Sequence, residues 1–385
     1  MNLKKLCSGL AASAVLSSIL LTGCASEKTI TTENAPNDIM KNLAAISSDS
    51  SAEDVTGALS AVVMKTAENY NYQLGLKAKG EGTTLDLGDG SIKTRPIETS
   101  SVDYRAALSD SVYEFLDQEI EERKSTGLMK ADADEIITAY ADTKSGSPDQ
   151  KSMELSYISS ETSAQQLKYS ADQIEDVAKN TVMIPLFADL GANLIISPVS
   201  LPEYYDYSLV QKGNNYTFTL KIKDLDKYNE YIDQYYSDKD QPARTDLNGD
   251  GSLMADEYVT DRMEISMTMN EEGVISSLTN SNYSKVSSGE NQTDDVYLAQ
   301  TISVIPCPQS LTDSMIDFFD QLSKGDMKEG QTFTLSFDGT VRSGGDDSNK
   351  DEDKSEQSED KKEEQAEQQK QESSSSEEKK DSSGK

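Results

Sequence analysis

Histidine and tryptophan are absent from the 385 residues of this chain. Without histidine, the Ser-His-Asp and Cys-His nucleophile systems are excluded, and zinc lacks its commonest nitrogen ligand. Positive charge is also scarce, since 36 Lys and Arg stand against 69 Asp and Glu and the formal net charge is -33. Such a chain repels phosphate backbones. We therefore expect no nucleic acid as a partner, and we expect divalent cations to be attracted.

The beginning of the chain carries an export signal. Two lysines precede an apolar stretch at residues 9–21, which is too short to span a bilayer, and residues 21–24 read Leu-Thr-Gly-Cys. This segment resembles the bacterial lipoprotein signal. The resemblance implies that residues 1–23 are a signal peptide and that Cys24 receives a diacylglycerol thioether. Because two or more acyl chains hold a protein on a membrane for practical purposes permanently, we expect a lipid-anchored protein on the extracytoplasmic face of the cell membrane.

Cysteine is rare, with three residues in the whole chain. Cys7 lies in the signal peptide and Cys24 is used by the anchor, so Cys307 is left without a disulfide partner in the chain. Cys307 lies between two prolines and has no histidine to activate it, and we interpret it as a small buried side chain. The lack of disulfides favours a Gram-positive envelope. It also means that the core or a metal must hold the exported domain together.

Composition divides the mature chain into three parts. Residues 24–36 are polar and end in proline, which indicates a lipidated tether. Residues 342–385 are almost entirely Asp, Glu, Lys, Ser and Gln, so we expect a disordered acidic tail, for which a solvating spacer is favoured over a partner-binding arm. The folded domain is expected at residues 37–341. A chain of that size buries roughly 70–75% of its unfolded surface.

The apolar residues of the domain alternate between helical and strand spacing. Helices are predicted over residues 37–69, 105–140, 173–197, 228–235 and 311–322. Strands are predicted from residue 70 to a turn at 88–90, at 153–157, at 205–210 and 216–220 around a turn, at 263–267 and 274–278, at 296–305 and at 333–337. No regular βαβ alternation is present, so the fold class is α+β with an antiparallel, curved sheet and covering helices. This layout resembles, distantly, that of bacterial lipoprotein-carrier and lipid-binding lipoproteins.

One segment matches a metal-binding motif. Residues 246–257 fit the twelve-residue EF-hand calcium loop D-x-[DN]-x-[DN]-G-x₅-E at every defined position. Ca²⁺ takes six to eight oxygen ligands. The loop would supply them from the side chains of Asp246, Asn248 and Asp250, the carbonyl of Ser252 and both oxygens of Glu257. We therefore expect Ca²⁺ as the cofactor.

Individual residues of this loop determine the calcium affinity and the role that we expect. Gly251 makes the sharp turn, and Leu253 stands where such loops pack an apolar residue into the domain. Met254 replaces the usual polar residue, so we expect a Kd on the order of 10⁻⁴ to 10⁻³ M. A single loop on an exported, disulfide-free chain favours a structural over a regulatory role. The loop also resembles those of dockerins, but a dockerin carries two in tandem.

Three functions remain open from the sequence. The first is a non-enzymatic surface protein that binds an apolar ligand between sheet and helices, or a surface protein or glycan. The second is a carboxylate-based hydrolase of envelope or dietary polysaccharide, which needs two carboxylates about 5–10 Å apart in a cleft. Its candidates are Glu119, Glu121 and Glu122, although a solvated helix face is favoured for them. The third is a structural spacer or adhesin. The tyrosines between residues 204 and 236 could stack on a ligand, but their spacing favours packing.

We predict that Cys24→Ala moves the protein from the membrane fraction of its host to the soluble fraction, because the acyl chains are lost. Fractionation and the mass of the mature chain measure this. Cys7→Ala is the matched control, since Cys7 lies in the leader and its loss should leave anchoring intact. Retention of the Cys24→Ala variant in the membrane would contradict the lipid anchor.

Overall fold

A computed structural model describes residues 27–86, 92–108, 111–120, 123–132, 134–147, 150–164, 202–238, 242–249, 251–288 and 293–338. In this part of the chain the strands are β1 (Lys28–Thr29), β2 (Gln73–Asp86), β3 (Lys93–Leu108), β4 (Ser111–Ile120), β5 (Arg123–Asp132), β6 (Glu135–Ser145), β7 (Ser152–Ala164), β8 (Tyr205–Lys212), β9 (Asn215–Ile222), β10 (Glu257–Met269), β11 (Ile275–Ser287), β12 (Thr293–Pro306) and β13 (Thr332–Ser336). The helices are α2 (Asp38–Ala45), α3 (Ala52–Asn69), α5 (Leu225–Asp238) and α6 (Gln309–Lys324), with a 3₁₀ turn η3 (Pro202–Tyr204).

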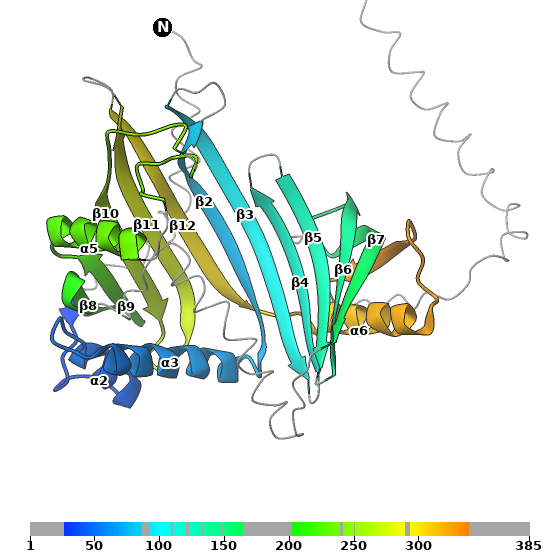
Figure 1. Cartoon of the computed structure of the whole chain (residues 1–385). Helices are drawn as coiled ribbons and strands as arrows, with labels where there is room; N and C mark the ends of the chain where they lie inside the picture. Colours follow the sequence, from blue (N-terminus) through cyan, green and yellow to red (C-terminus); the bar gives the residue numbers. More distant parts are fainter. Residues whose placement is uncertain are drawn as a thin grey trace, which may run out of the picture. The chain divides into compact units, whose positions relative to one another are not determined.

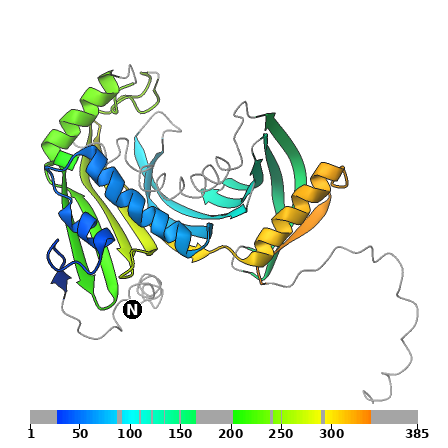
Figure 2. The same ribbon diagram turned by 90° about the horizontal axis from the view of Figure 1, so that it is seen from below.

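All thirteen strands belong to one antiparallel sheet, as the sequence predicted (Figure 1). Its order is β1-β8-β9-β10-β11-β12-β2-β3-β4-β5-β6-β7-β13, so β1 and β13 are its two edges and the sheet is open. Seen from below, the sheet bends along this order (Figure 2). Among the described residues, no helix is both long enough and apolar enough to cross a membrane.

The two halves of this sheet bury opposite faces. Residues directly opposite each other in a ladder share a face. Leu76 of β2 lies opposite Val304 of β12, on the face that α3 covers, but its partner in β3 is the charged Asp103. Tyr104 of β3 points the other way, together with Phe115 of β4, onto the face that α6 covers. We call these the α3 face and the α6 face.

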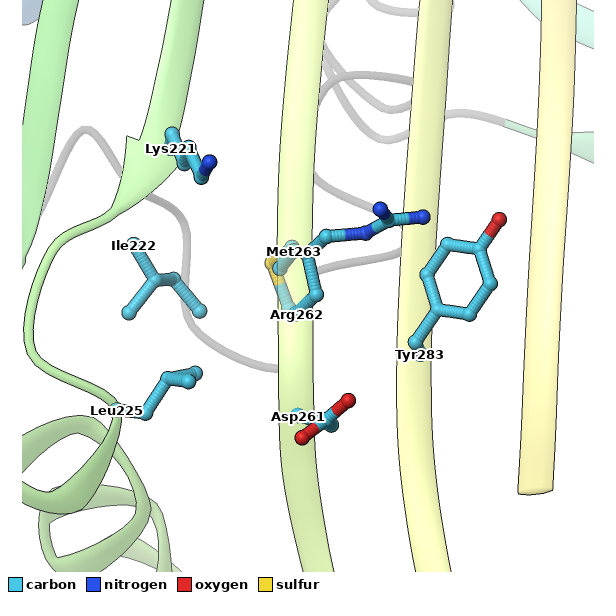
Figure 3. Close-up of a pocket in the computed structure, with 7 residues that line it drawn as sticks. All are labelled: Lys221, Ile222, Leu225, Asp261, Arg262, Met263 and Tyr283. Carbon is cyan, nitrogen blue, oxygen red and sulfur yellow. The ribbon is translucent and has the colours of Figure 1, made fainter.

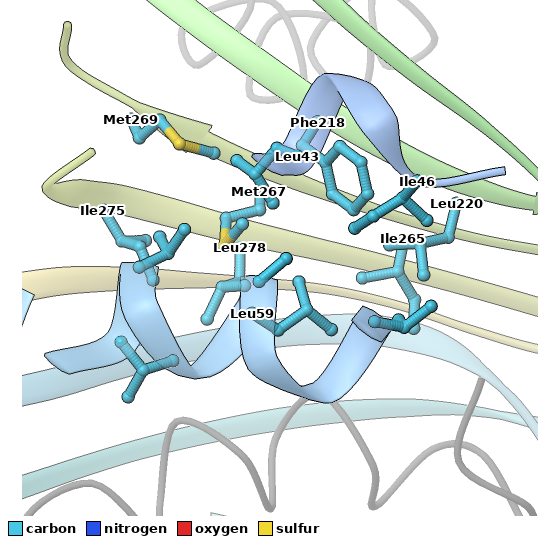
Figure 4. Packing of buried hydrophobic residues seen from close by; sticks show 14 of the residues in the cluster. Leu43, Ile46, Leu59, Phe218, Leu220, Ile265, Met267, Met269, Ile275 and Leu278 are labelled. Carbon is cyan, nitrogen blue, oxygen red and sulfur yellow. The ribbon is translucent and has the colours of Figure 1, made fainter. Parts of the chain in front are cut away.

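The larger core lies on the α3 face between the helices α2 and α3 and the strands β8 to β12 and β2 (Figure 4). Its most buried members include Leu43, Leu59, Phe218, Leu220, Ile265, Met267, Ile275 and Leu278. Each such side chain stabilises the fold by about 1.5–3 kcal/mol when fully buried. Helix α3 begins with a capping box, in which Ser51 and Asp54 satisfy each other's backbone N–H groups.

The second core lies on the α6 face and joins α6 to β3–β7 and β13. Phe115, Leu128, Met153, Leu155, Leu311, Met315 and Leu335 form its centre. Cys307 belongs to this core, and its thiol lies 3.5 Å from the Thr312 hydroxyl. Burial raises the pKa of this thiol to about 11, so it is protonated and inert at neutral pH. The interpretation of Cys307 as a buried side chain is confirmed.

The helix predicted over residues 105–140 is wrong. This segment forms the end of β3, all of β4 and β5 and the start of β6. Val112 is buried on the α3 face and Phe115 on the α6 face, so apolar residues on both sides of one strand imitated a helical spacing. Glu119 accordingly lies on β4 rather than on a helix, while Glu121 and Glu122 lie outside the described residues.

The other predicted helices and strands that lie within the described residues are confirmed, with changes in their ends. The block at 37–69 contains two helices, α2 and α3, and the strand from residue 70 pairs with β3 as an antiparallel hairpin. The hairpin β8–β9, the strands β7 and β10–β13 and the helices α5 and α6 lie where the periodicity placed them. The predicted helix at 173–197, the signal peptide with Cys24, and the tail at 342–385 lie outside the described residues.

Candidate functional site

Helix α5 satisfies backbone groups in the part of β10 that has no pairing with β9. Strand β9 pairs with β10 only from Glu264 onward, and α5 packs beside the remaining part of β10. Asn229 of α5 donates to the Thr260 carbonyl at 2.9 Å and accepts from the Thr260 N–H at 2.8 Å. The amide of Asn229 thus replaces a neighbouring strand, which keeps the backbone of β10 satisfied where the ladder ends.

Arg244 ties the chain that follows α5 to both α5 and β10. Its side chain is only 5% exposed. The guanidinium forms an ion pair with Asp233 at 2.8 Å and donates to Asn229 Oδ1 at 3.1 Å. The Thr260 hydroxyl lies 3.5 Å away. Because the charge of Arg244 is matched by Asp233, this cation is a structural tie rather than an open anion site.

A cavity of about 410 Å³ lies between α5, the α3 face of the sheet and the segment 242–247. Its apolar wall consists of Leu85, Tyr228, Ile232, Tyr236, Leu247, Tyr258 and Met263. Its polar groups belong to Arg244, Asp246, Thr260, Asn282 and Ser284. We call it the α5 cavity. Its volume and its mixture of aromatic walls with a few polar groups are typical of small-molecule sites.

The loop 246–257 forms the rim of this cavity. Its two ends are held together, since Leu247 N–H donates to the Leu253 carbonyl at 3.0 Å and Ala255 N–H donates to the Thr245 carbonyl at 2.8 Å. Leu253 packs against the small cluster formed by Ile92, Ala255 and Val286, as the motif predicted. Strand β10 follows the loop, so the arrangement is helix, loop and strand rather than helix, loop and helix.

Some of the expected calcium ligands of this loop are held by hydrogen bonds within the loop. The Asp246 carboxylate points into the loop, where it accepts from the Gly251 N–H at 3.0 Å, and Gly251 has the positive φ of 75° that a sharp turn requires. Asn248 donates to the Ser252 hydroxyl at 2.7 Å. Glu257 is the exposed first residue of β10.

A calcium ion fits the chemistry of this donor set, which is made of oxygen atoms only. Within the described residues, no three Asp, Glu, Cys or His side chains lie close enough together to hold a metal. Asp250, the third carboxylate of the motif, lies outside them. The fit therefore rests on the closed loop and on the inward carboxylate of Asp246.

A second hollow lies on the opposite side of β10, where β9 ends (Figure 3). It has a volume of about 440 Å³, with Ile222, Leu225 and Met263 as its apolar part. The Arg262 guanidinium lies 4.0 Å from the centre of the Tyr283 ring. Arg262 is exposed, so water solvates its charge, and this hollow is a weaker candidate than the α5 cavity with its buried polar groups.

A pair of carboxyl groups is found on β3 and β4, away from these cavities. Arg105 contacts Glu114 at 2.6 Å and Asp103 at 3.2 Å. Burial, together with the neighbouring Asp103, raises the pKa of Glu114 to about 7, although Arg105 opposes this. The three side chains form one tight cluster on the α3 face. Neither Asp103 nor Glu114 lines the α5 cavity or the hollow beside β9, whereas glycoside hydrolysis needs its two carboxyl groups in a cleft.

The tyrosines between residues 204 and 236 mostly pack against one another. Tyr205 and Tyr228 are almost fully buried, and their rings meet edge to face at 6.2 Å. Tyr204 lies against Tyr228 and Tyr231. The packing interpretation is confirmed for these residues. Tyr228 and Tyr236 also line the α5 cavity.

Sequence reasoning missed Arg244, Asn229 and Asn282. No local motif marks Arg244 or Asn229, because their partners come from other elements. Asn282 did have a signal, since the period-two alternation of β11 places Asn280 and Asn282 on the same face as the buried Leu278.

No protein-family model and no curated protein matches this sequence. Among solved structures, the chain is similar to a β-barrel-like protein of the domain of unknown function DUF1849 from Brucella abortus. The sequence identity is 8%, the match covers 61% of this chain and 98% of that chain, and the TM-score is 0.17. A similarity of this size carries no argument about function.

The raised pKa of Glu114 predicts a loss of stability with rising pH. In the unfolded chain this carboxyl titrates near 4.5, and in the folded chain near 7. Between these values the folded state holds a proton that the unfolded state has lost, so the free energy of unfolding falls as pH rises. We expect a loss on the order of 2 kcal/mol between pH 5 and pH 8. The window is free of histidine titration, because the chain has none.

Urea unfolding at a series of pH values measures this loss. Glu114→Gln keeps an acceptor for Arg105 and should flatten the profile. Glu119→Gln, an exposed neighbour on the same strand, should leave the wild-type slope unchanged. An equal slope in Glu114→Gln and wild type would show that Glu114 is not the cause.

Proposed function

We propose that this chain is a calcium-binding surface lipoprotein, anchored to the membrane through Cys24, that binds a small ligand without transforming it. The observation that carries the ligand-binding part is the α5 cavity, a space of about 410 Å³ between the sheet and a helix. The cavity has aromatic and aliphatic walls, a matched and buried cation in Arg244, and no reactive nucleophile among its described lining residues. Such a site suits binding better than chemistry.

The position of the loop supports a structural role for calcium. Asp246 and Leu247 belong both to the loop and to the wall of the α5 cavity. Arg244, two residues before the first calcium ligand, fixes the loop to α5 through Asp233 and Asn229. An ion held by Asp246, Asn248, Asp250, Ser252 and Glu257 would neutralise the carboxylates of this rim. The rim would then be ordered by the ion and by Arg244 together.

The remaining parts of the proposal concern location. A lipid on Cys24 would hold the domain at the membrane surface, and the acidic segment 342–385 would act as a solvating spacer. Lys28–Thr29 pairs with β8 and Ile30 is buried at 4% exposure, so the domain is fastened to the chain close to the anchor point. A ligand in the α5 cavity would therefore be held within a short reach of the membrane.

We predict that Ca²⁺ binds the mature chain, from residue 25 onward, with a Kd on the order of 10⁻⁴ to 10⁻³ M. At ten times the Kd, binding should stabilise the folded state by about 1.4 kcal/mol and raise the melting temperature. Titration calorimetry and thermal unfolding measure both effects. Asp246→Ala and Glu257→Ala should abolish the stabilisation, whereas Glu272→Gln, an exposed acid in the turn between β10 and β11, should not. The heat that remains in Asp246→Ala gives the background from the acidic tail.

We predict that N-phenyl-1-naphthylamine, an uncharged apolar dye, binds in the α5 cavity with a rise in fluorescence. Ala243 is exposed at the mouth of the cavity, so Ala243→Trp should cover the mouth without disturbing the core, and dye binding should weaken by about tenfold or more. The new indole would be the single tryptophan of the chain and would report directly on the mouth. As a control, Thr219→Trp places the same ring on the α6 face, far from the cavity. Equal dye binding by wild type and Ala243→Trp would remove the α5 cavity as the ligand site.

A further inference from the structure

Among the described residues, the buried side-chain oxygens of Thr99, Tyr205, Tyr207, Asn280 and Asn282 have no hydrogen-bond partner, and two of them are amide oxygens on one strand. These are the Oδ1 atoms of Asn280 and Asn282, both on β11. Asn280 is 6% exposed as a whole. A buried amide oxygen without a donor has given up its hydrogen bonds to water and gained none in return, which a fold avoids unless the group serves another purpose. Two such atoms on the same face of one strand indicate a place where a ligand could supply the missing donors.

The two acceptors form a short polar strip that continues from the α5 cavity. Asn282 lines the cavity, and Asn280 follows two residues along the same face, about 7 Å away. Thr99 of β3 belongs to the row of Asn280, through Gln300 and Gly80, and its hydroxyl is a third buried polar atom without a partner. Gly80 makes room for it, because a Cβ there would lie 2.6 Å from the Thr99 hydroxyl.

The charges around the strip select the kind of molecule that could use it. The charge of Arg244 in the cavity wall is already matched by Asp233, and the carboxylate of Asp246 is a ligand of the proposed calcium ion. The chain as a whole carries a net charge of -33. A carboxylate head group would bring no hydrogen-bond donor for Asn282 and would find no unmatched side-chain cation among the described lining residues, whereas an amine or a hydroxyl would bring the donor that Asn282 Oδ1 lacks.

We propose that the ligand of the α5 cavity is an amphiphile with a neutral or cationic, donor-rich head group. Its hydroxyl or amino group donates to Asn282 Oδ1, and its apolar part lies against Tyr236, Tyr258 and Met263. This inference rests on the proposed ligand-binding function and names the ligand class.

The test compares three probes that differ only in the head group: decylamine, decan-1-ol and decanoate. Each is titrated, below its aggregation concentration and at 0.15 M salt, into the mature chain loaded with N-phenyl-1-naphthylamine. The measured quantity is the loss of dye fluorescence. Decylamine that binds only to carboxylates on the protein surface does not displace the dye and therefore does not change this signal. We expect decylamine and decan-1-ol to displace the dye at concentrations about tenfold or more below decanoate.

Two variants of Asn282 separate a hydrogen bond from a change in shape. Asn282→Leu removes the acceptor, so it should weaken decylamine and decan-1-ol by about fivefold to tenfold relative to the dye, whose affinity for the same variant is measured alongside. Asn282→Asp keeps the acceptors and adds charge, so it should favour decylamine over decan-1-ol. Asn270→Ser, in the turn between β10 and β11, is the control for loss of an asparagine outside the cavity.

The outcomes distinguish the inference from the function on which it rests. Failure of the dye itself to bind would overturn the proposed ligand site. Normal dye binding with decanoate as effective as decylamine would overturn the head-group class alone. Unchanged decylamine and decan-1-ol affinities in Asn282→Leu would do the same. If Asn282→Leu does not fold, Asn282→Asp provides the test. Equal affinities of this variant for decylamine and decan-1-ol would show that the ligand's head group does not lie at residue 282.

Discussion

The change of buried face between β2 and β3 is the constraint on which the rest of this structure depends. A single sheet of thirteen strands has two faces to cover, and the chain covers one half of each. Leu76 on β2 packs under α3, whereas Tyr104 on β3 packs under α6. Because α3 and α6 cover opposite faces, the α3 face of β3 and β4 carries charged groups, the Arg105 cluster among them. Asn280 and Asn282 lie on the α3 face of β11, opposite Ile265 and Met263 of the larger core.

The short length of β9 explains why the cavity lies beneath α5. Strand β9 stops short, so β10 needs another partner, and α5 supplies one through Asn229. A helix fills an edge less completely than a strand does, since its side chains reach the sheet only along one stripe. The space left between that stripe and the sheet is the α5 cavity. The loop that follows is then fixed by Arg244 at the cavity rim, which places the calcium motif and the cavity side by side.

The sequence predicted those parts whose signals are local. The hairpin β8–β9 alternates cleanly because its α3 face is buried and its other face is solvated, and residues 246–257 match a contiguous motif. The helical prediction over 105–140 failed because Val112 and Phe115 are buried on opposite faces. The cavity could not be predicted, since Leu85, Tyr236 and Asn282 meet only in three dimensions. The ligand class follows from atoms that lack partners, which only the fold can show.

A crystal structure of the mature chain grown with Ca²⁺ and decylamine would test the central claim most directly. The account predicts one ion within the loop 246–257 and one decylamine between α5 and β11, with its nitrogen within hydrogen-bond distance of Asn282 Oδ1. The opposite result is an α5 cavity that holds only ordered waters, hydrogen-bonded to Asn280 and Asn282. In that case decylamine would lie in the hollow beside Arg262 or would not be bound at all, and the proposed ligand site would be wrong.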